Sequence, residues 1–447
     1  GLLFAKYVSV VTVAVLTAVV NLATMTVTLL VFDMGRLVFP EGLRPLAIVQ
    51  VFFLLLLFAA FFSAVLLAVT SFARSFKEAQ AYLIPLMLVS LAPGLIGMMP
   101  GLKLEGLYAV TPLLNIVLLA RDLLDAKAAV EPALAAVVIL STSVYALAAI
   151  ALAARIFGAE GVLYSEQGNW SDLFRRPARP RATPTLTSAL GCLALLFPAY
   201  FVVASLLRWA PLEERQWLQV LATFVLFALL PLLAAFRGRV RVVSAFRLRG
   251  GTWIAYPAAV LLGLGLVPVV YEMLAVLRAE RLTFFGREQE EQFRKQFEQW
   301  RTMSPWLLAG GLAIVGMLEE LFFRGYLFSA LRSVGGAALT ILGSALLFGL
   351  FHAPQAFDRL LPSTLLGVVL GWVCWRSGSV LPGMLLHAVY NALPILLVYY
   401  NPPTPGESAH WPLEWLGAGF AGVVTGAALL LASGGRKLPD NSENQGA

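Results

Sequence analysis

The sequence has few charged residues for its length. Asp, Glu, Lys and Arg make up 13% of its 447 residues, whereas a soluble domain carries about 25%. Apolar residues make up 60% of the chain. This balance excludes a soluble enzyme, a disordered chain, a collagen and a coiled coil. It predicts an all-α, polytopic membrane protein.

Cysteine and several catalytic motifs are also scarce or missing. Cys192 and Cys374 lie inside apolar runs, so we expect buried free thiols rather than a disulfide or a zinc knuckle. The sequence has no phosphate-binding loop, no His-Glu-x-x-His and no Gly-x-Ser-x-Gly elbow. The net charge of +7 does not indicate a nucleic-acid partner, because the basic residues occupy short loops between apolar runs.

Apolar segments long enough to span a bilayer dominate the chain. A spanning helix needs about 20 mostly apolar residues. We expect about twelve such helices in two helical membrane domains. Their approximate ranges are 8–32, 46–72, 80–100, 132–155, 185–207, 216–236, 253–277, 304–331, 336–353, 361–376, 380–400 and 415–434. The apolar stretch 107–120 is too short to span, and we expect a re-entrant or interfacial segment there.

A polar stretch, 156–184, separates the two predicted domains. Its arginines and prolines, concentrated in 175–181, exclude a spanning helix. We therefore predict a first domain at 1–155, a cytoplasmic linker at 156–184 and a second domain at 185–435. A cytoplasmic tail follows at 436–447. A glycosylation sequon at 169–171 would have no role on the cytoplasmic side.

The distribution of arginines predicts the orientation. With the linker inside, the basic loop 237–249, Arg332, Arg376 and the tail also fall inside, so we expect both termini in the cytoplasm. Segment 278–303 falls outside, and its aromatic spacing predicts an amphipathic helix on the membrane surface. The chain begins with Gly1, and no charged region precedes its first apolar run, which predicts a piece of a longer protein without a signal peptide.

Ionisable residues inside apolar segments are costly and are candidates for function. Glu319 and Glu320 follow a long, nearly uncharged run, and Arg324 comes one helical turn after Glu320. One arginine neutralises only one of two buried carboxylates. The other carboxylate must bind a metal, meet another cation or exchange protons as a general base.

Two of the three histidines also lie in apolar segments. His352 ends one segment, and His387 shares a helix face with Asn391, four residues later. His410 lies in a proline-rich loop, where we expect a solvated side chain. Counting from the predicted turn at 333–336 places Glu320 and His352 at similar depths, roughly 21 and 25 Å, whereas His387 lies only about 12 Å from its own turn.

These polar residues allow two hydrolytic mechanisms. In the first, a glutamate and His352 remove a proton from water, and His387 with Asn391 stabilises the oxyanion. In the second, Zn²⁺ activates the water. Its ligands would come from a set of four residues, namely Glu319, Glu320, His352 and His387. The spacing alone does not separate the two.

Three ordered motifs in 305–395 resemble those of the CPBP intramembrane proteases, which include the CAAX prenyl protease 2 (Rce1) type and bacteriocin-processing or immunity relatives. The matching residues are Glu319, Glu320 and Arg324 in the first motif, Phe348 and His352 in the second, and His387 and Asn391 in the third. The resemblance implies that Glu319 or Glu320 acts with His352 on water, while His387 and Asn391 form the oxyanion site. Arg324 and Phe348 would support them. The family has been called metalloproteases, and a metal-free glutamate mechanism is also argued for it.

The first domain resembles a different family. Short polar signatures at 75–80, 100–101 and 111–115 are similar to those in the C-terminal helices of ABC-2-type, NatB-like export permeases. The resemblance implies a permease–protease fusion in a bacterial inner membrane, together with a separate ABC ATPase subunit. Because prenylation is a eukaryotic modification, we expect a peptide or protein substrate rather than a true CAAX substrate.

The sequence therefore predicts an intramembrane endopeptidase fused to exporter helices. Two alternatives stay open. One is a non-catalytic permease, scaffold or immunity subunit of an ABC exporter. The other is a cation transporter that uses the glutamate pair and a histidine as an ion relay.

Overall fold

The computed structural model describes residues 2–32, 45–73, 75–97, 99, 101–125, 127–157, 176–177, 179–279, 298, 300–353, 359–400 and 410–433. Every regular element in these ranges is a helix, apart from one isolated bridge between Arg181 and Val240. The prediction of an all-α protein is confirmed. Most of the predicted linker and surface helix, and the whole predicted tail, lie outside the described residues.

Eleven helices in the described residues are long and apolar enough to cross a membrane. A twelfth apolar helix, Ala337–His352, is shorter than the others. Together they match the twelve predicted segments, and the chain is an integral membrane protein by length and composition of its helices. Cys192 and Cys374 are buried free thiols, as predicted.

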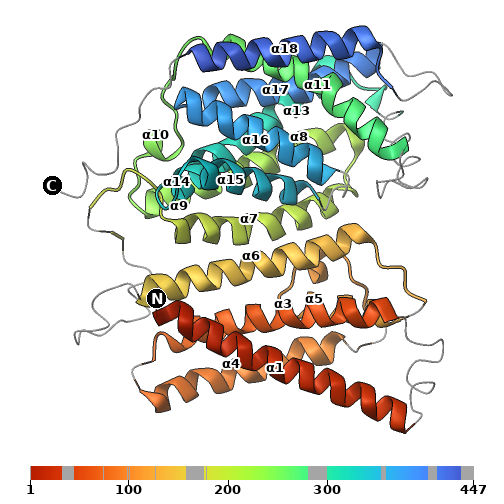
Figure 1. The fold of residues 1–447 in the computed structure, drawn as a ribbon, viewed down its shortest axis with the longest axis vertical. Coiled ribbons are helices and arrows are strands. Elements are labelled where there is room, and N and C mark those ends of the chain that lie inside the picture. The colour runs from red at the N-terminus through yellow and green to blue at the C-terminus, as the bar shows by residue number, and fades with distance from the viewer. Residues whose placement is uncertain are drawn as a thin grey trace. The chain divides into compact units, whose positions relative to one another are not determined.

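Contacts within the chain divide it into two compact units, 1–175 with 193–202, and 176–192 with 203–447. The first unit contains α1 (Leu2–Val31), α3 (Pro45–Thr70), α4 (Phe76–Gly97), the short η1 (Gly106–Ala109), α5 (Leu114–Leu124) and α6 (Pro132–Phe157). Helix α3 packs against α1, α4, α5 and α6 (Figure 1). Helix α5, which covers part of the predicted short stretch, is too short to span a bilayer.

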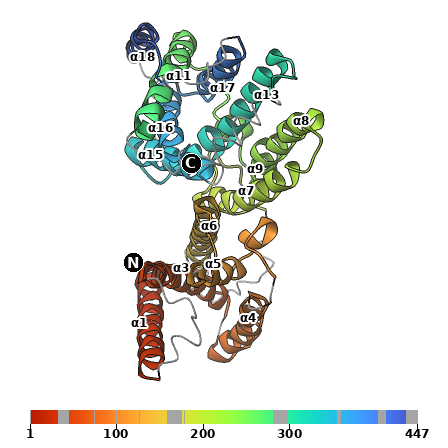
Figure 2. The ribbon, with the colours of Figure 1, turned by 90° about the vertical axis from the view of Figure 1, so that its right-hand side faces the viewer.

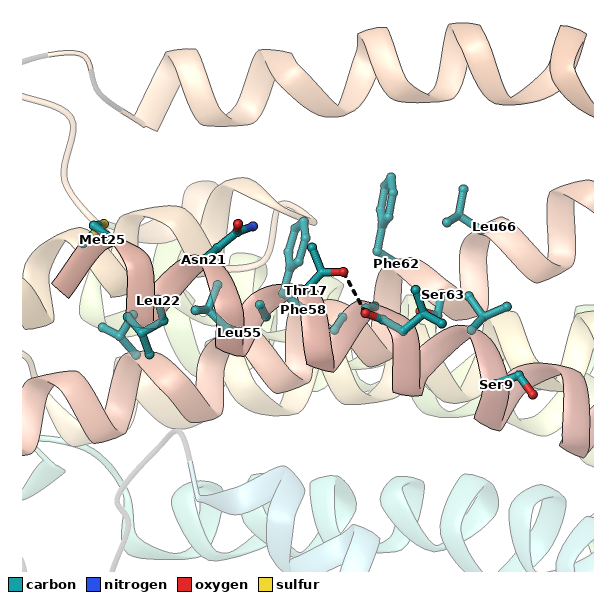
Figure 3. Close-up of a pocket in the computed structure, with 16 residues that line it drawn as sticks. Ser9, Thr17, Asn21, Leu22, Met25, Leu55, Phe58, Phe62, Ser63 and Leu66 are labelled. Atoms are coloured by element: carbon teal, nitrogen blue, oxygen red, sulfur yellow. Dashed lines mark hydrogen bonds between the residues drawn. The ribbon is translucent and has the colours of Figure 1, made fainter. Parts of the chain in front are cut away.

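Helices α1 and α3 border an open groove of about 850 Å³ (Figure 3). Its lining is mostly aliphatic and aromatic, with a few polar side chains such as Thr17, Asn21 and Ser63. The Thr17 hydroxyl donates to the Val13 carbonyl within its own helix. No lining residue is ionisable, so the groove offers no group for acid–base chemistry.

The second unit carries all the predicted catalytic residues on a bundle of helices (Figures 1 and 2). Its elements are α7 (Leu186–Leu207, whose middle belongs to the first unit), α8 (Leu212–Thr223), η4 (Phe224–Leu229), α9 (Leu230–Arg237), α10 (Val242–Ala245), α11 (Ala255–Ala279), α13 (Pro305–Glu320), η5 (Leu321–Leu327), α14 (Phe328–Arg332), α15 (Ala337–His352), α16 (Leu360–Ser377), α17 (Leu381–Tyr400) and α18 (Leu413–Ala432). Helix α13 packs on α17, α15 on α16, and α11 on both α17 and α18.

Two short turns set the order of the helices around the site. The predicted turn at 333–336 joins α14 to α15. Gly378 ends α16 with a φ of 72°, and its N–H donates to the carbonyl of Cys374. A residue without a Cβ suits this left-handed cap. Antiparallel neighbours joined by short turns bring the three motif-bearing helices into one bundle.

His410 is exposed, as predicted, with 47% of its side chain accessible to solvent. Its Nδ1 also lies 2.8 Å from Oε1 of Glu272 on α11, a contact that the sequence did not indicate. The other Glu272 oxygen accepts the N–H of Trp411 at 2.9 Å. The partner is 138 residues away in sequence, so the loop's own composition gave no sign of it.

Candidate active site

The two adjacent glutamates form the last turn of α13. Glu319 is 3% exposed and Glu320 is fully buried. Immediately after them the chain leaves α-helical geometry for a π-helix, η5. Such π segments frequently occur at functional sites. The sequence pattern placed the two carboxylates in an apolar segment, and the structure buries both of them.

Glu320 is held by Arg324, which is also fully buried. Nη1 of Arg324 donates to Oε1 of Glu320 at 2.8 Å, and Nη2 donates to the carbonyl of Gly367 on α16 at 3.0 Å. The guanidinium also lies 4.4 Å from the ring centroid of Phe348. The predicted ion pair is therefore present, and it ties α13 and η5 to α15 and α16.

His387 connects to the same carboxylate oxygen. Its Nδ1 lies 2.9 Å from Oε1 of Glu320. Because Arg324 donates to that oxygen and an ionised carboxylate only accepts, Nδ1 of His387 must carry the hydrogen. In the neutral ring, Nε2 then carries no hydrogen and is a hydrogen-bond acceptor. Nε2 of His387 lies 3.9 Å from Oε2 of Glu319.

His352 has the same tautomer for a different reason. Its Nδ1 lies 2.8 Å from the carbonyl oxygen of Phe348, one turn earlier in α15. A carbonyl accepts and never donates, so Nδ1 carries the hydrogen and Nε2 is an acceptor in the neutral ring. The Phe348 ring packs 4.5 Å from the His352 ring. Nε2 of His352 lies 3.8 Å from Oε2 of Glu319.

Glu319 therefore lies between two imidazole nitrogens without a direct hydrogen bond to either. Separations of 3.8 and 3.9 Å exceed hydrogen-bond length. Both rings are fixed through Nδ1, by Phe348 and by Glu320, and both present Nε2 to the same carboxylate oxygen. Of the two glutamates, Glu319 alone keeps an oxygen facing both histidines, and this distinction was not predictable from the sequence.

Asn391 lies one turn after His387 and reaches α13. Its Nδ2 donates to the carbonyl of Leu312 at 3.3 Å, which uses one of the two amide hydrogens. Gly316, one turn before Glu320, makes this approach possible. A Cβ on Gly316 would lie 2.7 Å from Nδ2 of Asn391 and 2.9 Å from Cδ2 of His387. The missing side chain explains how His387 reaches Glu320 despite the shallower position predicted for it.

Gly316→Ala is accordingly expected to lower cleavage activity about a hundredfold, because a misplacement of about 1 Å at a reacting group has effects of that size. The added Cβ must push His387 and Asn391 away from α13. Gly310→Ala in the same helix is the matched control, since a Cβ there meets nothing within 4 Å. Steady-state cleavage rates of the two purified variants check this. Equal activity of both would show that the close approach at Gly316 is unimportant.

Sequence reasoning also missed Arg359, which immediately precedes α16. Its charge acts on both Glu319 and His352. The first turn of α16 packs closely on the last turn of α15. The close approach is clear at Gly349, where a Cβ would lie only 2.8 Å from the carbonyl oxygen of Leu360. The only sequence signal was a cation between the apolar segment that ends at His352 and the next apolar segment.

The donor types in this cluster suit zinc, which takes imidazole nitrogen and carboxylate oxygen. However, no three His, Cys, Asp or Glu side chains in the part of the chain that the structure describes are gathered closely enough to hold a metal ion. Glu320, one of the four predicted ligands, already interacts with Arg324 and His387.

Comparison with known proteins identifies one part of the chain. The family model described as "Type II CAAX prenyl endopeptidase Rce1-like" matches residues 301–393. This range includes all seven motif residues, from Glu319 to Asn391. No curated protein and no solved structure matches the chain. The chain thus contains an Rce1-like domain of a protease family within an integral membrane protein.

Proposed function

We propose that this protein is a CPBP-type intramembrane endopeptidase in which Glu319 is the general base. The observation that carries the proposal is the position of Oε2 of Glu319 between the Nε2 atoms of His352 and His387. Glu320 instead holds Arg324 and His387 in place, because its Oε1 lies within hydrogen-bond distance of both. The Rce1-like match at 301–393 supports a protease.

The first step is the activation of water by Glu319 and His352. A water molecule between Oε2 of Glu319 and Nε2 of His352 donates one hydrogen bond to each, which directs its own lone pair towards the substrate. Glu319 takes the proton as the oxygen attacks the peptide carbonyl. The burial of the site strengthens this electrostatic positioning, since little bulk water competes. Glu319 then returns the proton to the leaving amine.

The second step is stabilisation of the oxyanion by His387 and Asn391. Nε2 of His387 lies 3.9 Å from Oε2 of Glu319, and with a hydrogen on that nitrogen the ring donates a hydrogen bond to the oxyanion. The second amide hydrogen of Asn391, not used by Leu312, provides another.

A peptide library tests the activity without knowledge of the substrate. The detergent-purified protein is incubated with the library, and products are read by mass spectrometry beside the Glu319→Gln and His352→Ala variants. Products that form only with the wild type support the proposal. Products that form equally with all three folded proteins would assign them to a contaminating protease. No wild-type product would favour the scaffold or immunity alternative.

The catalytic steps above need no metal, and we propose a metal-free mechanism. Treatment with a strong chelator followed by dialysis is expected to leave the cleavage rate unchanged, because water is positioned by Glu319 and His352 themselves. The metal content of the active protein, measured by plasma mass spectrometry, is expected to be well below one ion per chain. Loss of activity that zinc restores would contradict the proposal and favour the second mechanism.

We also propose that residues 1–155 are the C-terminal helices of an ABC-2-type permease that works with a separate ABC ATPase in a bacterial inner membrane, with both termini cytoplasmic. Asn115, in the signature 111–115, is buried, and its amide donates to Ser141 and Thr142 of α6. Such a bond fixes the short α5 inside the unit. Co-purification of an ATPase with the tagged chain from its native membrane tests this, and its absence under mild detergent would count against the fusion.

A further inference from the structure

Seven exposed arginines gather on one part of the second unit, and we call them the arginine surface. They come from the end of the predicted linker and from the loop around α9 and α10. The members are Arg176, Arg179, Arg181, Arg237, Arg239, Arg241 and Arg249. Neither 176–186 nor 237–252, the two segments that supply them, contains an aspartate or a glutamate.

Backbone bonds hold the two segments together. The N–H of Arg181 donates to the carbonyl of Arg239, and the N–H of Arg241 donates to the carbonyl of Arg181, both at 3.0 Å. Arg176 adds a second link, because its Nη2 donates to the carbonyl of Phe236 at 2.8 Å and its guanidinium stacks on the ring of that residue. The arginines are therefore brought together by the fold and are not merely close in sequence.

The loop also presents its arginines outwards. Val240 is 8% exposed, whereas Arg239 and Arg241 on either side of it are exposed. The two arginines therefore lie at the surface on either side of a buried residue. Arg239 has a φ of 49°, a left-handed conformation that residues other than glycine rarely adopt.

Exposed apolar side chains lie among the arginines. Phe236 is 67% exposed and Val243 is 51% exposed. They flank the end of α9 and the start of α10, where the chain leaves a spanning segment (Figure 1). At the end of a membrane helix, arginines lie at the level of the lipid headgroups and neighbouring apolar side chains lie at the level of the acyl chains.

We propose that the arginine surface binds the headgroups of anionic phospholipids. Guanidinium groups pair with phosphate through two parallel hydrogen bonds, and the exposed apolar side chains enter the acyl region beside them. An acidic protein partner would also match the charge, but the position at the end of a spanning segment favours lipid headgroups, which lie at that level of the membrane. The positive-inside rule explains why basic residues lie on this side. The rule does not require them to cluster, whereas the bridge between Arg181 and Val240 holds them in one place.

The loop that carries part of the arginine surface contacts the turn before α17, the helix that carries His387. The backbone carbonyl of Arg247, in the same loop, accepts the N–H of Val380 at 3.0 Å, immediately before α17 begins at Leu381. A Cβ on Gly251 would lie 3.0 Å from the carbonyl oxygen of Ser377. A headgroup that holds the loop therefore also steadies the start of the helix that carries His387.

The test measures lipid retention by the full chain, independently of any protease activity. The protein is placed in nanodiscs of mixed phosphatidylglycerol and phosphatidylcholine, released, and analysed by native mass spectrometry. The test variant combines Arg181→Gln, Arg239→Gln and Arg241→Gln. The control combines Lys103→Gln, Arg208→Gln and Arg301→Gln, which removes the same charge at exposed positions outside the arginine surface.

The wild type is expected to retain phosphatidylglycerol in preference to phosphatidylcholine. The test variant should bind it about a hundredfold more weakly, since each arginine near an anionic surface contributes about fivefold, and the control should bind as the wild type does. Equal retention by the test variant, or an equal loss in the control, would overturn the proposal. If the test variant does not fold, added salt should release phosphatidylglycerol from the wild type, and salt-insensitive retention would contradict the site.

Discussion

Glu319→Gln is expected to reduce the rate of peptide cleavage by about a thousandfold, within the range typical of a lost general base, while the protein stays folded. Gln is close to Glu in size, so the packing at the end of α13 is preserved. The amide can still hydrogen-bond, but it cannot take a proton from water. Cleavage rates and thermal unfolding of the purified variant, measured together, check both parts.

Glu320→Gln is the matched comparison, one residue along the chain. It removes the charge that Arg324 and His387 share, so we expect a clear loss of thermal stability as well as of activity. The two glutamates thus differ in their expected effect on thermal stability. If Glu320→Gln lost only activity and Glu319→Gln lost stability, the assignment of roles would be reversed.

Arg324→Met is expected to destabilise the protein by about 3–5 kcal/mol, the usual result of removing one partner of a buried ion pair. Met fills much of the volume but leaves the Glu320 carboxylate buried beside His387, without the arginine that paired with it. The bond from Arg324 to the Gly367 carbonyl is lost as well. Thermal unfolding in detergent measures the effect, and Arg208→Met, at the end of α7, serves as the exposed control.

Combining Arg324→Met with Glu320→Gln should restore part of that stability, because both members of the buried pair are then neutral. Activity should not return, since His387 no longer has a carboxylate to fix its ring. A double variant no more stable than Arg324→Met alone would show that the arginine acts mainly through Gly367 and Phe348.

The helices and the polar motifs were largely predictable from the sequence. Runs of apolar residues specify spanning helices because a bilayer requires internal backbone hydrogen bonds. Buried ionisable residues mark the site because their burial is costly. The pair of Glu320 and Arg324 followed from helical spacing alone, and the structure places Arg324 where that spacing puts it.

The relation between helices was not predictable in the same way. Counting residues from each turn placed His387 too shallow, since the count cannot include how two helices pack, such as the close approach of α13 and α17 at Gly316. The pair formed by His410 and Glu272 depends on a contact between residues far apart in sequence. The distinct positions of the two adjacent glutamates likewise depend on which neighbouring helix each one faces.

The most direct test of the account is cleavage of an identified peptide in water enriched in oxygen-18. The account predicts that the wild type places one heavy oxygen in the new terminal carboxylate and that Glu319→Gln forms no labelled product in the same time. Product formed without the label would show that water is not the attacking group. Labelled product formed at the wild-type rate by Glu319→Gln would contradict the role of Glu319 as the base.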